Sequence, residues 1–89
     1  MNDRELLEMA AKAAGYTAFE GQAAQLVDSG WNPRDDDGEA FRLALRVPHL
    51  NLQWVIAEAF QAFPDNNEAR ETYARLTIVE FAAKFGKAM

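Results

Sequence analysis

Apolar residues recur every three or four positions in three stretches of the chain, a spacing that predicts amphipathic helices. These stretches cover residues 3–14, 36–47 and 67–85. The last of them has the widest apolar stripe, so we expect this helix to be the most buried. Gly86 and Lys87 follow it, and we expect them to end the helix.

The stretch WNPRDDDGEAF, residues 31–41, contains the start signal of the second helix. Pro33 pushes the residue before it away from helical geometry, so the helix can begin only after the proline. Asp35 or Asp36 is then the natural N-cap, and acids in the first turn are favoured by the helix dipole. The three aspartates are thus explained without a ligand.

Two further features of the helical stretches concern their faces and caps. In the second helix the predicted buried stripe consists of Phe41, Ala44 and Leu45. Before the third helix, Asp65 followed by Glu68 three residues later resembles a capping box. We therefore expect these apolar side chains in the core and Asp65 at the start of the last helix.

Residues 50–63 have an apolar pattern that fits either a strand or a helix. Leu50, Leu52, Trp54 and Ile56 alternate with other residues, as in a strand. From residue 57 onward the alanine and glutamate content favours a helix instead. We expect a strand over 50–56 and leave the remainder open.

Residues 16–30 are similarly ambiguous, because Gly21 and Gly30 divide the region into short pieces. Residues 16–19 could open a short strand, and residues 23–27 could form a second short strand or a helical turn.

Length and composition indicate one domain, residues 1–89, with 49% hydrophobic and 26% charged residues. The chain has no cysteine, which excludes disulfides and thiolate metal sites and fits a reducing cytosol. The N-terminus lacks the apolar core of a secretory signal, and no run approaches the roughly 20 apolar residues that span a bilayer. We expect a cytoplasmic protein with no membrane partner.

The net charge of −5 argues against a nucleic-acid partner. Affinity for nucleic acid depends mainly on lysine and arginine neutralising phosphates, and nine basic residues here face 14 acidic ones.

Three segments resemble the phage ABA-sandwich domain family of small, mostly uncharacterised phage and prophage proteins. They are DRELLEMAAKAAG at 3–15, WNPRDDDGEAFRLALRV at 31–47 and IVEFAAKFGKAM at 78–89. The resemblance implies an α+β fold in which a small antiparallel sheet packs between about three helices, and it favours strands in 16–28 and 50–63. It also implies a phage or prophage origin, and it supplies no activity and no catalytic residues.

Candidate chemistry is sparse, and we expect no enzymatic activity, no cofactor and no metal. An EF-hand register through Asp35–Asp37 places Pro33 at its first ligand position and Ala44 at its twelfth, so it fails. The single serine and single histidine, Ser29 and His49, show no spacing typical of a nucleophilic triad. Glu58 and Glu80 lie in apolar runs, where exposure on a polar face is the simpler interpretation.

The aromatic residues are the best candidates for a binding role. Trp31, Trp54, Phe60 and Phe63 lie near expected loops or element ends, where exposed aromatic side chains would form an interaction patch. We therefore predict a non-enzymatic phage accessory protein that binds a host or phage protein. A homodimer through residues 52–63 is a lower-ranked possibility.

Two alternatives to this function stay open. The first is an inhibitor of host defence, such as an anti-CRISPR protein, that acts through an acidic surface. The second is a small metal-dependent hydrolase that uses the Asp35–Asp37 cluster.

Overall fold

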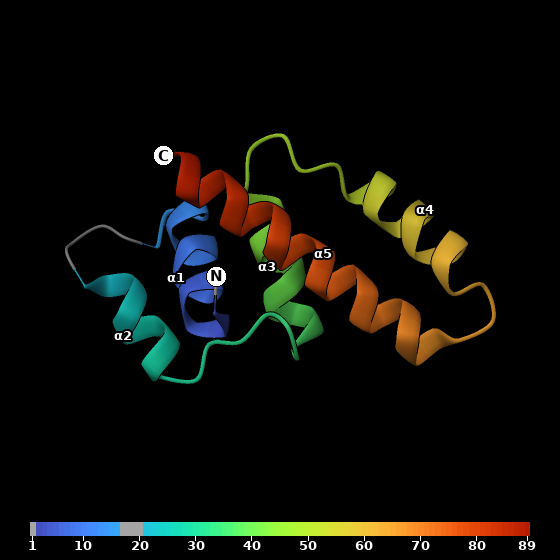
Figure 1. Cartoon of the computed structure of the whole chain (residues 1–89), viewed down its shortest axis with the longest axis horizontal. Coiled ribbons are helices and arrows are strands. Elements are labelled where there is room, and N and C mark those ends of the chain that lie inside the picture. The colour runs from blue at the N-terminus through green and yellow to red at the C-terminus, as the bar shows by residue number, and fades with distance from the viewer. Residues whose placement is uncertain (1, 17–20) are drawn as a thin grey trace.

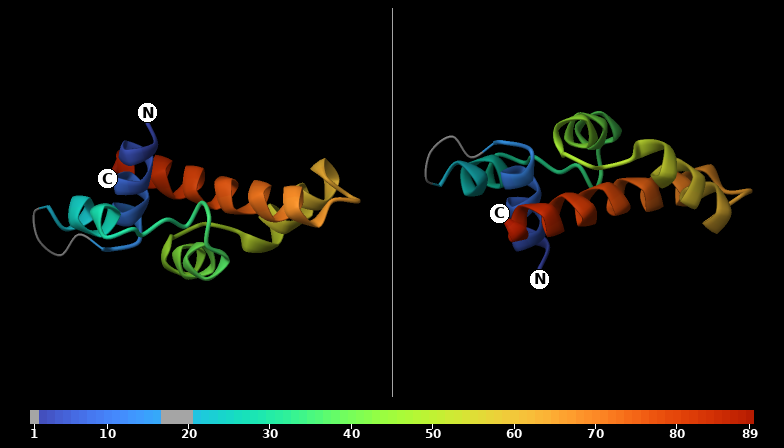
Figure 2. Two further views of the ribbon diagram at one scale, coloured as in Figure 1. Left: turned by 90° about the horizontal axis from the view of Figure 1, so that it is seen from below. Right: turned by 90° about the horizontal axis from the view of Figure 1, so that it is seen from above.

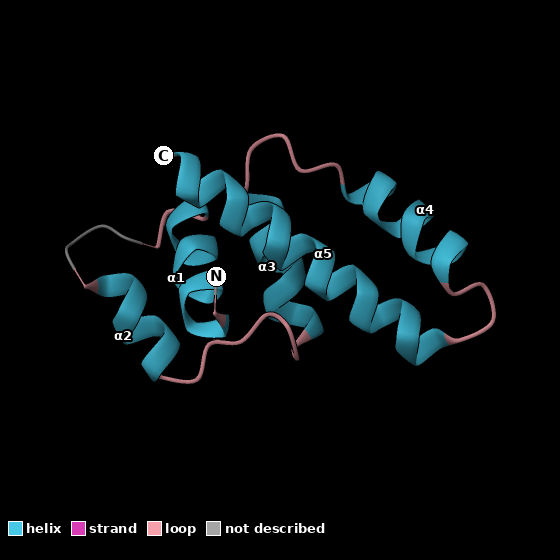
Figure 3. Ribbon diagram, viewed as in Figure 1, coloured by secondary structure: helices cyan, strands magenta, loops and turns pink. Residues whose placement is uncertain are grey.

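A computed structural model of the chain describes residues 2–16 and 21–89, and within this part it consists of five helices and no strand (Figures 1 and 3). The helices are α1 (Asp3–Ala13), α2 (Gln22–Asp28), α3 (Asp37–Arg46), α4 (Leu52–Ala62) and α5 (Asn67–Ala88). The α+β sandwich predicted from the sequence is therefore wrong. Helices α1, α3 and α5 lie within three residues of the predicted ranges at each end.

Helix α5 is the central element of the fold. At 22 residues it is the longest helix, and it packs against α1, α3 and α4, while α2 lies against α1 (Figure 1). Figure 2 shows α3 nearly end-on, crossing beside α5, and α4 on the part of α5 far from α1. The molecule is elongated as a result, with principal extents of 43 × 25 × 22 Å.

Residues 52–62 form helix α4 and not the predicted strand. The side chain of Asn51 caps the helix by accepting a hydrogen bond from the backbone N–H of Trp54 at 3.1 Å. Val55 and Ala59, four residues apart, are the two buried side chains and contact α5 on one face. The alternation that suggested a strand arises because apolar residues occur on nearly every side of this helix.

Residues 22–28 form the short helix α2, so the predicted strand over 16–28 is also wrong where the structure describes it. Residues 17–20 lie outside the described part of the chain. Gly21 and Gly30, with φ of 83° and 99°, supply the left-handed backbone at the two ends of α2. Arg4 of α1 binds Asp28 at 2.6 Å, and this hydrogen bond lowers the pKa of the Asp28 carboxyl.

The last helix begins and ends differently from the prediction. Its N-cap is Asn66, which accepts from the backbone N–H of Ala69 at 3.0 Å, whereas Asp65 was expected there. At the other end the helix continues through Gly86 to residue 88. Gly86 is therefore not the helix terminator.

Gly86 allows α1 and α5 to approach closely. A Cβ atom at this position would overlap the backbone oxygen of Met9 and lie 2.9 Å from its carbonyl carbon. Small side chains line the rest of the contact, and all of them are buried: Ala10, Ala13, Ala82 and Ala83. The backbones of α1 and α5 thus meet through glycine and alanine, and adding a single methyl group would push them apart.

No helix within the described ranges is long and apolar enough to cross a membrane.

Candidate functional site: an apolar face on α3 and α4

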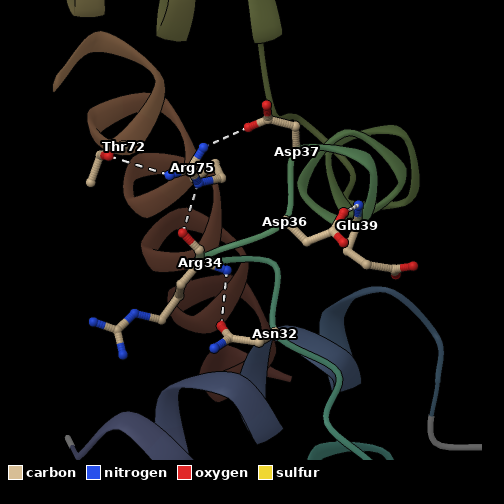
Figure 4. Close-up of polar contacts among 7 residues, drawn as sticks. All are labelled: Asn32, Arg34, Asp36, Asp37, Glu39, Thr72 and Arg75. Carbon is tan, nitrogen blue, oxygen red and sulfur yellow. Dashed lines mark hydrogen bonds and ion pairs between the residues drawn. The ribbon is translucent and has the colours of Figure 1, made fainter. Parts of the chain in front are cut away.

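The acidic stretch at the start of α3 is held by contacts within the chain (Figure 4). Asp36 is the N-cap and accepts from the backbone N–H of Glu39 at 2.9 Å. Asp37 accepts from the guanidinium of Arg75 on α5 at 2.6 Å, while Asp35 accepts from the side-chain amide of Asn32 at 2.8 Å. Each aspartate therefore has a different partner, and the three carboxylates do not converge on one point.

Arg75 connects this loop to α5. Besides Asp37 it donates to the backbone oxygen of Arg34 at 2.7 Å and to the hydroxyl of Thr72 at 3.3 Å (Figure 4). Among the residues that the structure describes, no three of the His, Cys, Asp and Glu side chains are arranged to hold a metal ion. The acidic stretch is thus engaged in fixing the start of α3 against α5.

The other candidate catalytic residues are also engaged separately. The hydroxyl of Ser29 donates to the backbone oxygen of Leu26 at 2.6 Å, while the ring of His49 lies 6.4 Å from that of Phe85. Glu58 accepts from the hydroxyl of Tyr73 at 3.2 Å, and this hydrogen bond raises the pKa of Tyr73. The Ser29 bond lies at the end of α2, the His49 ring lies against α5 and the Glu58 bond joins α4 to α5, so the three residues lie at three separate places.

The four aromatic residues of the predicted interaction patch do not come together. Trp31 is 9% exposed, its indole N–H donates to Glu39 at 3.0 Å, and its ring packs edge-on against that of Tyr16. The other three lie on α4 or just after it. On α4, Trp54 is rotated by about 200° around the helix axis relative to Ile56, so the two side chains point to different sides of the helix. Phe63 follows the helix and packs against Tyr73.

A different set of apolar residues forms one surface. A hollow of about 280 Å³ lies where α3, α4 and α5 meet, and its apolar lining is Ala40, Phe41, Leu52, Ile56, Ala74 and Ile78. Leu45 lies one helical turn beyond Phe41, and Phe60 one turn beyond Ile56, so the surface continues along both helices. We call Phe41, Leu45, Ile56 and Phe60 with this hollow the apolar face.

The side chains of the apolar face are large and exposed. Phe41 and Phe60 are each 52% exposed, Leu45 is 69% exposed and Ile56 is 46% exposed. Arg70 of α5 lies over the ring of Phe60, with its guanidinium carbon 4.0 Å from the ring centroid, and donates to the backbone oxygen of Phe63 at 2.8 Å. Arg70 thus holds the α4–α5 turn and the far end of the apolar face in place.

Sequence reasoning missed the α3 half of this face. It assigned Phe41 and Leu45 to the buried stripe, but the buried residues of α3 are Ala40, Leu43 and Ala44, followed by Val47 at the C-cap. The stripe that faces the core thus runs through Ala40, Leu43, Ala44 and Val47, and Phe41 and Leu45 lie beside it on the outside. The sequence signal that could have found them is the i,i+4 pair of large residues flanking a stripe that contains alanine.

Comparisons with known proteins identify no relative of this chain: no protein-family model, no curated protein and no solved structure matches it.

Proposed function

We propose that the protein is a non-enzymatic binding module that docks on another protein through the apolar face. The observation that carries this proposal is the exposure of four large apolar side chains, of which Phe41 and Ile56 line one hollow and Leu45 and Phe60 lie one helical turn further along the same two helices. The largest apolar patch on a typical monomeric protein measures about 300–600 Å² and is often functional. Covering such a patch is favourable by about 25 cal/mol per Å². Surfaces like this one are typical of sites for a partner protein.

The shape of the face supports a protein partner. Two helices, α3 and α4, border a hollow whose floor is formed by Ala74 and Ile78 of α5. Grooves between helices commonly bind the apolar side chains of a partner helix at i, i+3 and i+4 spacing. The hollow of about 280 Å³ is smaller than typical small-molecule sites, which begin at roughly 300 Å³. It is large enough for one or two side chains of a partner.

The distribution of charge favours the acidic inhibitor as a second candidate. Residues 1–39 hold nine acidic and three basic residues, whereas residues 40–89 hold five acidic and six basic ones. The acidic half could therefore occupy a basic groove on a host defence protein. Such binding would weaken steeply as NaCl is added, whereas binding through the apolar face would not.

Site-specific photo-crosslinking in bacterial cells tests the proposed function directly, because a crosslink forms wherever a partner touches the protein. A benzoyl-phenylalanine is placed at residue 45 or 60 on the apolar face, and at Gln25 on α2 as the matched control at an exposed position elsewhere. We expect discrete crosslinked products from positions 45 and 60 and none from position 25. Equal labelling from all three positions, or no product from the face, would refute the proposal.

A further inference from the structure

We infer that the occupant of the apolar face is a second copy of this chain, in a two-fold dimer that pairs α3 and α4 of one copy with those of the other. This inference rests on the proposed function and names its partner. The charge, the area and the shape of the face each support it.

Charge is the first support for self-association. Two copies that each carry a charge of −5 repel one another unless their contact avoids the acidic residues. The apolar face lies on α3, α4 and α5, in the half of the chain with five acidic and six basic residues. The outward side of α4 consists of uncharged residues, Gln53, Ala57 and Gln61, and its single acid, Glu58, is bonded to Tyr73. The hollow is also lined by Asp37, Glu71 and Arg75, of which Asp37 and Arg75 are paired, and Arg70 lies over Phe60, so acidic and basic side chains balance on the face.

The exposed area is the second support. A large side chain presents about 200 Å² when fully exposed, so the four of the apolar face leave roughly 400 Å² in water. A standard interface covers about 800 Å² on each partner, of which somewhat more than half is apolar. The apolar face therefore supplies about the apolar share that one side of a standard interface needs.

Shape is the third support, because the face contains both a ridge and a hollow. Phe41 and Leu45 form a ridge of large side chains along α3, and the hollow lies between this ridge and Ile56 of α4. In a two-fold interface the same patch faces itself, so the ridge of each copy can enter the hollow of the other.

Sedimentation equilibrium on the purified full chain tests the dimer. We expect the mass to rise with concentration from 10.0 kDa toward twice that value, and the dissociation constant not to increase between low and high NaCl. Leu45→Glu should raise the dissociation constant by roughly a hundredfold, because a two-fold interface contains each residue twice. Gln25→Glu on α2 adds the same charge away from the face and should leave the constant unchanged.

The possible outcomes separate this inference from the proposed function. A wild-type mass that stays at 10.0 kDa at millimolar concentration overturns the dimer, as does a dimer that Leu45→Glu leaves intact. If the chain is monomeric but crosslinks from residues 45 and 60 to a different protein, the binding face stands and the second copy is excluded. If neither a dimer nor a crosslink forms, both proposals fail.

Discussion

Replacing Gly86 with alanine should lower the free energy of unfolding by about 3 kcal/mol, the upper end of the usual cost of overpacking. The expected sign is unusual, because alanine is the better helix former by about 1 kcal/mol and Gly86 lies inside α5. The new methyl group would overlap the backbone oxygen of Met9, which cannot rotate away as a side chain could. Thermal denaturation should show a melting temperature lower by roughly 15 °C.

Gly38→Ala is the matched control for this change. Gly38 also lies in a helix, but it is exposed, and its nearest neighbour would be the side chain of Asp36 at 3.2 Å. That side chain can shift, so we expect a change within about 1 kcal/mol in either direction. A Gly86→Ala protein as stable as the wild type would show that α1 and α5 do not approach as closely as described.

The two tryptophans should respond very differently to truncation. Trp31→Ala should cost about 3–5 kcal/mol, because it empties a buried site and leaves Glu39 without its indole partner. That loss approaches the whole stability of many domains of this size. Trp54→Ala should change the free energy of unfolding by less than about 1 kcal/mol, since this ring is 53% exposed.

Urea denaturation followed by circular dichroism measures both tryptophan variants under the same conditions. Fluorescence provides an independent check, because the remaining tryptophan of Trp54→Ala is buried and should emit at shorter wavelength than the wild-type average. Similar stability losses for the two variants would contradict the assignment of Trp31 to the core and of Trp54 to the surface.

Local signals in the sequence were sufficient to predict a helix such as α3, whose two faces differ in polarity. The stretch that became α3 has a proline before it, an aspartate cap and charged residues on the outer side, and each of these acts within one helical turn. Helix α4 has no such contrast, because the buried pair Val55 and Ala59 is surrounded by further apolar residues. The spacing of apolar residues along the chain cannot distinguish a strand from a helix when both the buried and the exposed sides are apolar.

The apolar face itself could not be predicted from the sequence, for a reason that concerns how α3 is rotated against the core. Sequence patterns assign large apolar side chains such as Phe41 and Leu45 to the core by default. In this fold Ala40, Leu43, Ala44 and Val47 fill the positions that face the core, and Phe41 and Leu45 lie beside them on the outside. Which side of α3 faces the core depends on how the helix packs against α5, and that packing is a property of the assembled fold.

Amide NMR spectra recorded during dilution test most directly whether the apolar face is where the protein binds another copy. Between millimolar and low micromolar concentration we expect the signals of residues 41–46 and 52–62 to shift, and those of residues 22–28 in α2 to stay in place. Leu45→Glu should remove the concentration dependence. Spectra that do not change on dilution, or shifts centred on α2, would contradict an interface formed by α3 and α4.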